Sequence, residues 1–558
     1  MSRPTRSRVM LALVAVSAVV ASACGGESGS SDQTEPTAQD AETGAVSSTT
    51  GVGRGGATPS TASGVNVSAS TLVEQGTVGD PDSTVRIILT LPPQSWDPHK
   101  STTPNAAITF TSQIYDRLLY LEADGTLSPM LATSWRFSED GLGLDLELRD
   151  DVTFHNGEVF DAEVAASNLI RAKDLGLAVA PQLANVVSAE ATAPHILHLT
   201  LDHSDPAFLF NLATVAGSII SPSGMNDPGL EQAPSGSGPF TLVSSDSTRV
   251  VFQRNDDYWN KDLVLPASKE LLIAEDEVAR INALEAGDVD AAGGISAASL
   301  PSLQRKIDDG TYNLYSYNSY VGIVLKFNTT LAPLDQSEVR TAINLAIDRD
   351  LLNDVAQEGA GDPKHQIVAS GFPGNVDGLR YDYDPDEART LLDRAGVSDV
   401  TMELVMPTVE PYATIAQLIQ QQFAAVGITV NLQSFAATEA RPAWREGAFH
   451  MALLGDGLTN PDPSSAANNF LGPDQPGPID ETLQQLVNEA SAFEIGEART
   501  KAFEAVSRYI FEEALGAPTV TVANIYLARP SVLGMDQMPF ASQGRNQDTL
   551  PLILAMGR

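Results

Sequence analysis

The sequence predicts an α/β fold built from more than one domain, and three observations support that prediction. Stretches in the first half of the chain alternate apolar with polar residues, as half-buried strands do. In the second half, amphipathic helices alternate with short apolar strands, an order that is typical of parallel sheet. The length of 558 residues corresponds to between two and four domains, at roughly 100–200 residues per domain.

The strands predicted in the first half rest on patterns of period two. Residues 85–91 form an apolar run that ends at Pro92-Pro93, and proline cannot donate to a strand ladder. Leucine occupies every second position over 142–148 and again over 197–201. Both leucine segments are therefore predicted to be strands with one buried face. A helix is expected over 161–174.

The helices predicted in the second half rest on capping residues. Ser337 is the expected N-cap of a helix whose apolar face runs from Val339 to Ile347. Asp384-Pro385-Asp386-Glu387 combines an N-cap with proline at the first helical position and a capping-box glutamate, and Gly396 closes that helix.

One stretch predicts a complete βαβ unit. A strand over 402–405 is followed by a helix over 410–426, which Gly427 stops, and by a second strand over 428–432. Such a crossover joins two parallel strands of one sheet.

Residues 1–23 are predicted to be a lipoprotein signal peptide. Three arginines within the first eight residues precede an apolar run over 9–20, and Ala21-Ser22-Ala23 leads into Cys24, the layout of a cleavable signal. The segment resembles a bacterial lipobox, which implies a diacylglyceryl thioether on Cys24. An ordinary signal with an incidental cysteine is the alternative. A membrane-spanning anchor is disfavoured because the run is shorter than the ~18 residues that a span needs.

Residues 24–81 are predicted to be a disordered tether. The stretch is rich in Gly, Ser, Thr and acidic residues, and no aromatic residue occurs before Trp96. Such a composition buries too little surface to offset the entropy of ordering. The glycine-rich run over 51–56 has neither the strand nor the helix that a phosphate-binding loop requires.

Composition excludes several partners. The chain carries 33 basic and 71 acidic residues, a net charge of −38, which argues against nucleic acid and anionic lipid because both bind basic surfaces. Cys24 is the only cysteine, so no intramolecular disulfide can form. A body of this size buries enough apolar surface to fold without one.

No catalytic constellation emerges from the sequence. The motifs of nucleophile elbows, phosphate loops and HExxH metalloproteases are absent from it. His195, His198 and His203 are the only histidine cluster, and strand periodicity sends the first two to opposite faces. We therefore predict no enzyme activity, no metal site and no cofactor.

A series of segments in one order resembles the family 5 extracellular solute-binding proteins, the dipeptide, oligopeptide and nickel class that serves ABC importers. These segments are residues 96–99 (WDPH), 114–119 (IYDRLL), 129–135 (PMLATSW), 148–157 (LRDDVTFHNG), 236–240 (GSGPF), 254–259 (RNDDYW), 287–290 (GDVD), 327–329 (FNT) and 339–349. Taken one by one, their aromatic residues are expected in the core, and Arg340 and Asp348 on helix surfaces.

The resemblance implies a two-lobed fold of the periplasmic-binding-protein kind, type II, in its large peptide-binding class. Lobe I would comprise residues 82–322 plus 519–558, with a subdomain inserted at about 123–232, and lobe II residues 323–518. The two chain crossings are expected near Tyr320 and Pro518. Solute would bind in the cleft between the lobes, which close over it by a hinge motion.

The resemblance also suggests where the lobe II side of the site lies. The loop over 455–463 supplies the candidates Asp456, Thr459, Asn460 and Asp462. Counted back from Asp462-Pro463, the aspartate that holds a peptide α-ammonium in related proteins falls on Thr459, and a neutral threonine cannot make that charge-assisted bond. Either Asp456 takes over the role or the ligand lacks a free amino terminus; a plain acidic loop is the other interpretation.

Three more residues are candidates for ligand contact. Ser101 and Thr102 follow the WDPH segment and could line the lobe I side of the cleft. Trp444 could stack on a flat or sugar ligand, although a core or surface position is at least as plausible for tryptophan.

The expected function is that of an exported, monomeric, lipid-anchored receptor on the outer face of the cell membrane. It would capture a peptide or similar polar solute and deliver it to an ABC permease. The alternatives on the same scaffold are an oligosaccharide or a metal chelate as ligand, or a sensor that presents its ligand to a membrane protein. A secreted hydrolase is disfavoured by the motif search.

Overall fold

The structure is a computed structural model. It describes residues 79–101, 104–122, 125–260, 266–455, 462–472, 475–535 and 555–557. Side chains are described for all of these except residues 104–106, 317–321 and 555. The predicted signal peptide with Cys24, and the predicted tether as far as residue 78, lie outside the described residues. So do the candidates Thr102, Asp456, Thr459 and Asn460.

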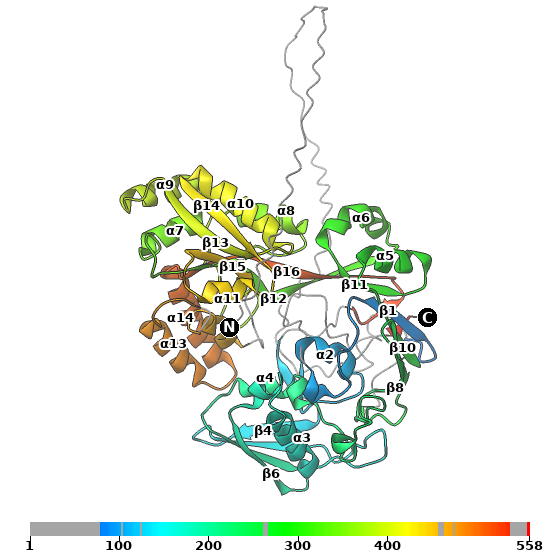
Figure 1. The fold of residues 1–558 in the computed structure, drawn as a ribbon. Coiled ribbons are helices and arrows are strands. Elements are labelled where there is room, and N and C mark those ends of the chain that lie inside the picture. The colour runs from blue at the N-terminus through cyan, green and yellow to red at the C-terminus, as the bar shows by residue number, and fades with distance from the viewer. Residues whose placement is uncertain are drawn as a thin grey trace, which may run out of the picture. The chain divides into compact units, whose positions relative to one another are not determined.

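One large mixed sheet runs through the described chain (Figure 1). Its ten strands follow the order β14-β13-β15-β12-β16-β11-β1-β10-β9-β8. Their bounds are β1 (Thr84–Leu89), β8 (Phe240–Ser245), β9 (Arg249–Arg254), β10 (Ser268–Ile273), β11 (Ala291–Ile295), β12 (Asn313–Phe327), β13 (Val400–Pro407), β14 (Ile428–Phe435), β15 (Met451–Gly455) and β16 (Gly516–Ala528).

The antiparallel pair β12 and β16 joins two halves of this sheet. Strands beyond β16 come from residues 84–295, and strands beyond β12 come from residues 400–455. Each half has apolar cores of its own: Ile87, Phe252 and Leu271 belong to one, and Ile343 and Phe423 to another. The long strands β12 and β16 therefore connect two separately packed bodies.

A second, antiparallel sheet has the order β4-β5-β7-β6. Its strands are β4 (Ala132–Phe137), β5 (Gly143–Leu148), β6 (Val186–Ala193) and β7 (Ile196–Leu201), and α3 (Ala162–Asp174) and α4 (Phe208–Leu212) pack with them around one core. The alternate leucines of β5 and β7 are buried, which confirms the period-two prediction. Leu142 is an exception, because it precedes β5 and is 39% exposed.

The βαβ prediction is confirmed. β13 and β14 pair in parallel from Val400 to Pro407, and α10 (Tyr412–Ala425) connects them. The capping prediction for α9 (Pro385–Arg394) is also confirmed, because the Asp384 carboxylate accepts the backbone N–H of Glu387 at 2.9 Å.

Ser337 is not an N-cap. It is the first residue of α7 (Ser337–Leu345), and the cap position falls on Gln336, whose side chain makes no capping bond. The backbone N–H of Val339 already reaches the Gln336 carbonyl at 3.2 Å, so the helix starts one residue earlier than the cap preference of serine predicts.

The remaining elements are further α-helices, turns of 3-10 helix and two-stranded ribbons. They are α2 (Pro104–Thr111), α5 (Glu277–Ala286), α6 (Leu300–Asp308), α8 (Arg349–Gln357), α11 (Ala440–Arg445), α12 (Pro463–Asn468), α13 (Glu481–Ser491), α14 (Glu497–Glu512), η1 (Pro98–Lys100), η2 (Ala180–Leu183), η3 (Val215–Gly217), η4 (Gly224–Asn226), η5 (Ala297–Ser299), β2 (Leu119–Leu121), β3 (Leu127–Pro129), β17 (Val532–Leu533) and β18 (Ala555–Met556). Within the described ranges, none of the helices has the length and apolar character that a membrane span requires.

Candidate functional site

Ser101 is the candidate that the structure places most clearly. It ends η1 and is only 1% exposed, and its Oγ has no hydrogen-bond partner among the described residues. A buried hydroxyl that lacks a partner costs roughly 1–3 kcal/mol, and in native structures such a group needs an explanation such as a water or a ligand. Ser101 therefore stays a candidate for hydrogen bonding to a bound solute.

A partly buried ion pair between Arg171 and Asp97 holds η1 and with it Ser101. Arg171 of α3 donates to both carboxylate oxygens of Asp97, at 3.0 and 2.6 Å, and to Nδ1 of His99 at 2.9 Å. His99 in turn donates from Nε2 to the carbonyl of Ser218 at 3.0 Å. Burial and the nearby Arg171 charge lower the pKa of His99 to about 4, so the ring is neutral at physiological pH.

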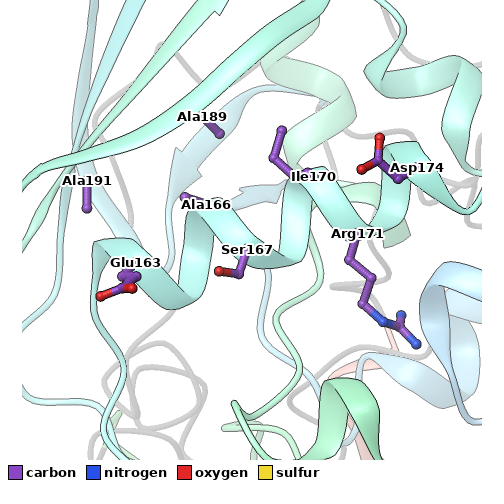
Figure 2. Close-up of a pocket in the computed structure, with 8 residues that line it drawn as sticks. All are labelled: Glu163, Ala166, Ser167, Ile170, Arg171, Asp174, Ala189 and Ala191. Carbon is purple, nitrogen blue, oxygen red and sulfur yellow. The ribbon is translucent and has the colours of Figure 1, made fainter.

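Sequence reasoning singled out the WDPH segment but missed Arg171, which lies far from it in the chain. Figure 2 shows the Arg171 side chain extending from α3, among the residues that line a surface groove of about 470 Å³. The groove itself is lined by Glu163, Ala166, Ser167, Ile170, Arg171, Asp174, Ala189 and Ala191. It contains none of the predicted ligand contacts, so Arg171 matters here for what it does to Asp97 and His99.

Asp462 takes part in a buried ion pair. Arg499 of α14 donates to both of its carboxylate oxygens, from Nε at 2.7 Å and from Nη2 at 2.8 Å. Asp462 also caps α12 by accepting the backbone N–H of Ser464 at 3.0 Å. These contacts give Asp462 a structural role, and the ligand role predicted for it stays a prediction.

Trp444 occupies a core position. Its side chain is 0% exposed and packs in α11 against a small apolar cluster under β13 and β15. Of the two interpretations offered by the sequence, the structure places Trp444 in the packed one, where stacking on a solute would require the cluster to open.

Arg340 is not a surface ion, contrary to the sequence-based expectation. Its buried guanidinium donates to the carbonyls of Leu334 at 3.0 Å, Glu513 at 2.6 Å and Ala514 at 3.1 Å. It thereby satisfies carbonyls at the end of α14 that would otherwise lack donors. Asp348 caps α8 by accepting the N–H of Leu351 at 3.0 Å.

Three of the segments that carried the family resemblance meet at one buried carboxylate. Asp116 accepts hydrogen bonds from the Ser237 hydroxyl at 2.9 Å, the Tyr258 hydroxyl at 3.0 Å and Nε1 of Trp259 at 2.8 Å. Burial raises the pKa of Asp116 to about 6, although the hydrogen bonds from these three donors act to lower it. The shared motif residues therefore form a structural node and not a ligand site.

Replacing Asp116 by asparagine is expected to remove a pH dependence of stability. Because the folded-state pKa lies near 6 and the ordinary value near 3.8, the unfolded chain ionises first as the pH rises. The wild type should thus lose up to about 3 kcal/mol of unfolding free energy, relative to Asp116→Asn, between pH 4 and pH 7. Urea unfolding across this range measures the difference.

Asp150→Asn, at an exposed position, is the matched control for the removal of one carboxylate. A difference between Asp116→Asn and wild type that does not change with pH would contradict the assignment of a raised pKa to Asp116.

The histidine cluster does not converge. His195 lies in the turn before β7, and His198 points its Nδ1 at the Asp145 carboxylate, 2.7 Å away. In the described part of the chain, no group of three or more His, Cys, Asp or Glu side chains is arranged to hold a metal ion.

These observations define a class: two separately packed α/β bodies share one large sheet and are joined through two of its strands. The model of the bacterial extracellular solute-binding proteins, family 5, matches residues 126–478. The chain belongs to this family, and its two-lobed fold of the periplasmic-binding-protein kind is the one predicted from the sequence.

Relatives that are named for different ligands resemble the chain over most of its length. A nickel-binding periplasmic protein of Escherichia coli K12 is 28% identical over 477 residues, which cover 79% of this chain and 90% of that protein. Di/tripeptide-binding protein 1 of Pseudomonas aeruginosa is 27% identical over 428 residues, covering 68% and 76%. The solved structure of HbpA2 from Haemophilus parasuis superimposes with a TM-score of 0.76 at 22% identity, covering 85% of this chain and 100% of that one.

The relatives are binding proteins and not enzymes. The prediction that the chain is an extracellular solute-binding protein without enzymatic activity is therefore confirmed.

Proposed function

We propose that the chain is a lipid-anchored receptor that captures a peptide or similar polar solute between two lobes and delivers it to an ABC importer. One observation carries the proposal: in a chain of a solute-binding family, two bodies with separate cores are connected through β12 and β16. A joint of two strands permits the hinge closure that periplasmic binding proteins use.

The proposed lobes are residues 82–322 plus 519–558 and residues 323–518, with the subdomain at about 123–232 built around the sheet β4-β5-β7-β6. Residues 24–81 would be the tether that links the body to the lipid on Cys24. Tethering raises the effective concentration of the receptor at the membrane that holds the permease.

The proposed contacts with solute are Ser101 and Thr102 on one lobe and Asp456, Thr459 and Asn460 on the other. Ser101 supports this set because its hydroxyl is buried without a partner in the described chain. Asp462 and Trp444 would hold neighbouring segments of the site in place without contacting the solute, because both are buried among protein atoms. Closure excludes water, so a solute must satisfy the polar groups it buries.

Native mass spectrometry of protein purified without refolding tests the proposal. We expect a retained mass that corresponds to a peptide of a few residues. A retained oligosaccharide or metal chelate would change the proposed ligand class. If a deletion strain takes up every candidate solute as well as the wild type does, the importer role is contradicted.

Replacing Asp456 by asparagine is expected to weaken the binding of peptides with a free amino terminus by about 10–100-fold, because a hydrogen bond to a charged group contributes about 1.5–3 kcal/mol. Calorimetry with a panel of di- and tripeptides, each also as its N-acetyl form, measures the effect. The exposed Asp393→Asn is the control. If Asp456→Asn leaves every affinity unchanged, Asp456 does not bind the α-ammonium group of a peptide. The neutral Thr459 would then indicate a ligand that has no free amino terminus.

A further inference from the structure

A segment that follows α8 pairs with β16 on the side of that strand opposite β12, at the point where the two halves of the sheet meet. Residues 362–364 pair with residues 519–521: the N–H of Thr521 donates to the Asp362 carbonyl and the N–H of Lys364 to the Thr519 carbonyl, each at 2.9 Å. Further along β16, Ile525 to Ala528 pair instead with β11 of the other half. On this side of β16, the pairing partner therefore changes from residues 362–364 to β11 between Thr521 and Ile525.

Gln357, the last residue of α8, fills the gap between these two pairings. Its Nε2 donates to the carbonyl of Thr521, and its Oε1 accepts the backbone N–H of Ala523 at 3.3 Å. One primary amide thereby supplies the donor and the acceptor that a neighbouring strand would supply. The side chain is 4% exposed, so water does not compete for these bonds.

The same segment also contacts β12 and the core of the other half. The Ser316 hydroxyl of β12 donates to the Ala360 carbonyl at 3.0 Å, and Ala360 packs against the apolar cluster that contains Ile525 and Leu527. The pairing of β12 with β16 shifts register twice, between Asn318 and Gly322 and between Ile323 and Val324. Such irregularities bend strands and mark where a ladder is weakest.

A glycine makes this close approach possible. A Cβ on Gly361 would lie 2.6 Å from the backbone carbonyl oxygen of Thr521, well inside van der Waals contact. A larger residue at this position would therefore push residues 357–364 away from β16.

We propose that residues 357–364 form a brace that sets the hinge between the lobes, with Gln357 as its positioning residue. The inference rests on the proposed two-lobed closure. Because Gln357 belongs to lobe II and bonds to Thr521 and Ala523 of β16, just past the crossing proposed near Pro518, its two bonds restrain the bend of the connection. The apparent affinity of a hinged receptor scales with the fraction of molecules in the binding-competent state, so the brace tunes affinity without touching solute.

The test uses the full chain with Cys24→Ser, which contains no other cysteine. Nitroxide labels on Val243→Cys in β8 and Lys501→Cys in α14 report the distance between the lobes in protein stripped of ligand by unfolding and refolding. We expect Gln357→Ala to add a second distance population that the wild type lacks. We also expect exchange of the Ala523 amide hydrogen to speed up about tenfold, as loss of one hydrogen bond implies.

Gln420→Ala is the matched control, because Gln420 donates to the Val430 carbonyl at 2.7 Å inside one half of the sheet. It should leave the distance distribution unchanged. Gln357→Glu keeps the acceptor for Ala523 but not the donor for Thr521, so it should protect the Ala523 amide and still add the second population. An unchanged distribution in both Gln357 variants, or the same change in Gln420→Ala, would overturn the brace. None of these readouts requires a known solute, so they stand apart from the mass measurement that tests the proposed function.

Discussion

Replacing Arg499 by methionine lowers the free energy of unfolding by about 3–5 kcal/mol, the cost of leaving one partner of a buried ion pair alone. The arginine and Asp462 are both buried, and two hydrogen bonds of 2.7 and 2.8 Å join them. Methionine fills much of the same volume but removes every donor, so the Asp462 carboxylate stays buried without its cation.

Arg499 also supports a second element. Its Nη1 donates to the carbonyls of Ser491 at 2.7 Å and Phe493 at 2.8 Å, at the end of α13, where carbonyls have no partner within the helix. The substitution therefore loosens α12, which Asp462 caps, together with α13. Because Asp462 directly follows the candidate loop 456–461, binding of the retained solute should weaken along with stability.

Urea unfolding measures the effect, and two further variants isolate its cause. Arg508→Met changes an exposed arginine of the same helix and should shift the unfolding free energy by no more than about 0.5 kcal/mol. Adding Asp462→Asn to Arg499→Met removes the stranded charge while keeping an oxygen for the Ser464 N–H, and should recover a large part of the loss. If the double variant is as unstable as the single one, the ion pair is not the reason for the buried arginine.

The parts of the fold that could be predicted are those that local sequence determines. Alternate leucines predicted β5 and β7, and Asp384 with Pro385 predicted the start of α9, because strand faces and helix caps depend on neighbours in the chain. The pairing of β12 with β16 depends instead on residues about 200 positions apart, and no periodic pattern in either strand identifies its partner. The resemblance to a family supplied only the two expected chain crossings, near Tyr320 and Pro518, and not the pairing of these strands.

The site was harder to predict for a related reason. Asp462 and Trp444 were singled out by their place in a motif and by residue type, whereas their roles depend on burial and on partners such as Arg499 that are distant in sequence. Arg340 was assigned to a helix surface, yet it binds carbonyls 173 and 174 residues away. The sequence does not show whether a charged side chain binds water or a distant carbonyl. The burial of these residues could therefore not be predicted from the sequence.

Replacing Cys24 by serine is expected to move the protein from the membrane fraction to the soluble exported fraction. Serine cannot form the thioether, so the variant would lose the acyl chains of the predicted lipid, each of which would contribute about 0.8 kcal/mol per buried methylene. Among the described residues no helix could span a membrane, and the net charge of −38 disfavours binding to anionic lipid.

Fractionation of cells followed by immunoblotting measures the distribution, and the mass of the amino-terminal peptide reports the lipid directly. Ser28→Ala, a few residues into the tether, keeps Cys24 and should remain with the membrane. If Cys24→Ser stays in the membrane fraction after a high-salt wash, the anchor is not the lipid. The same variant provides the cysteine-free background for the distance measurements on the brace, so a protein that folds normally without its anchor separates attachment from solute binding.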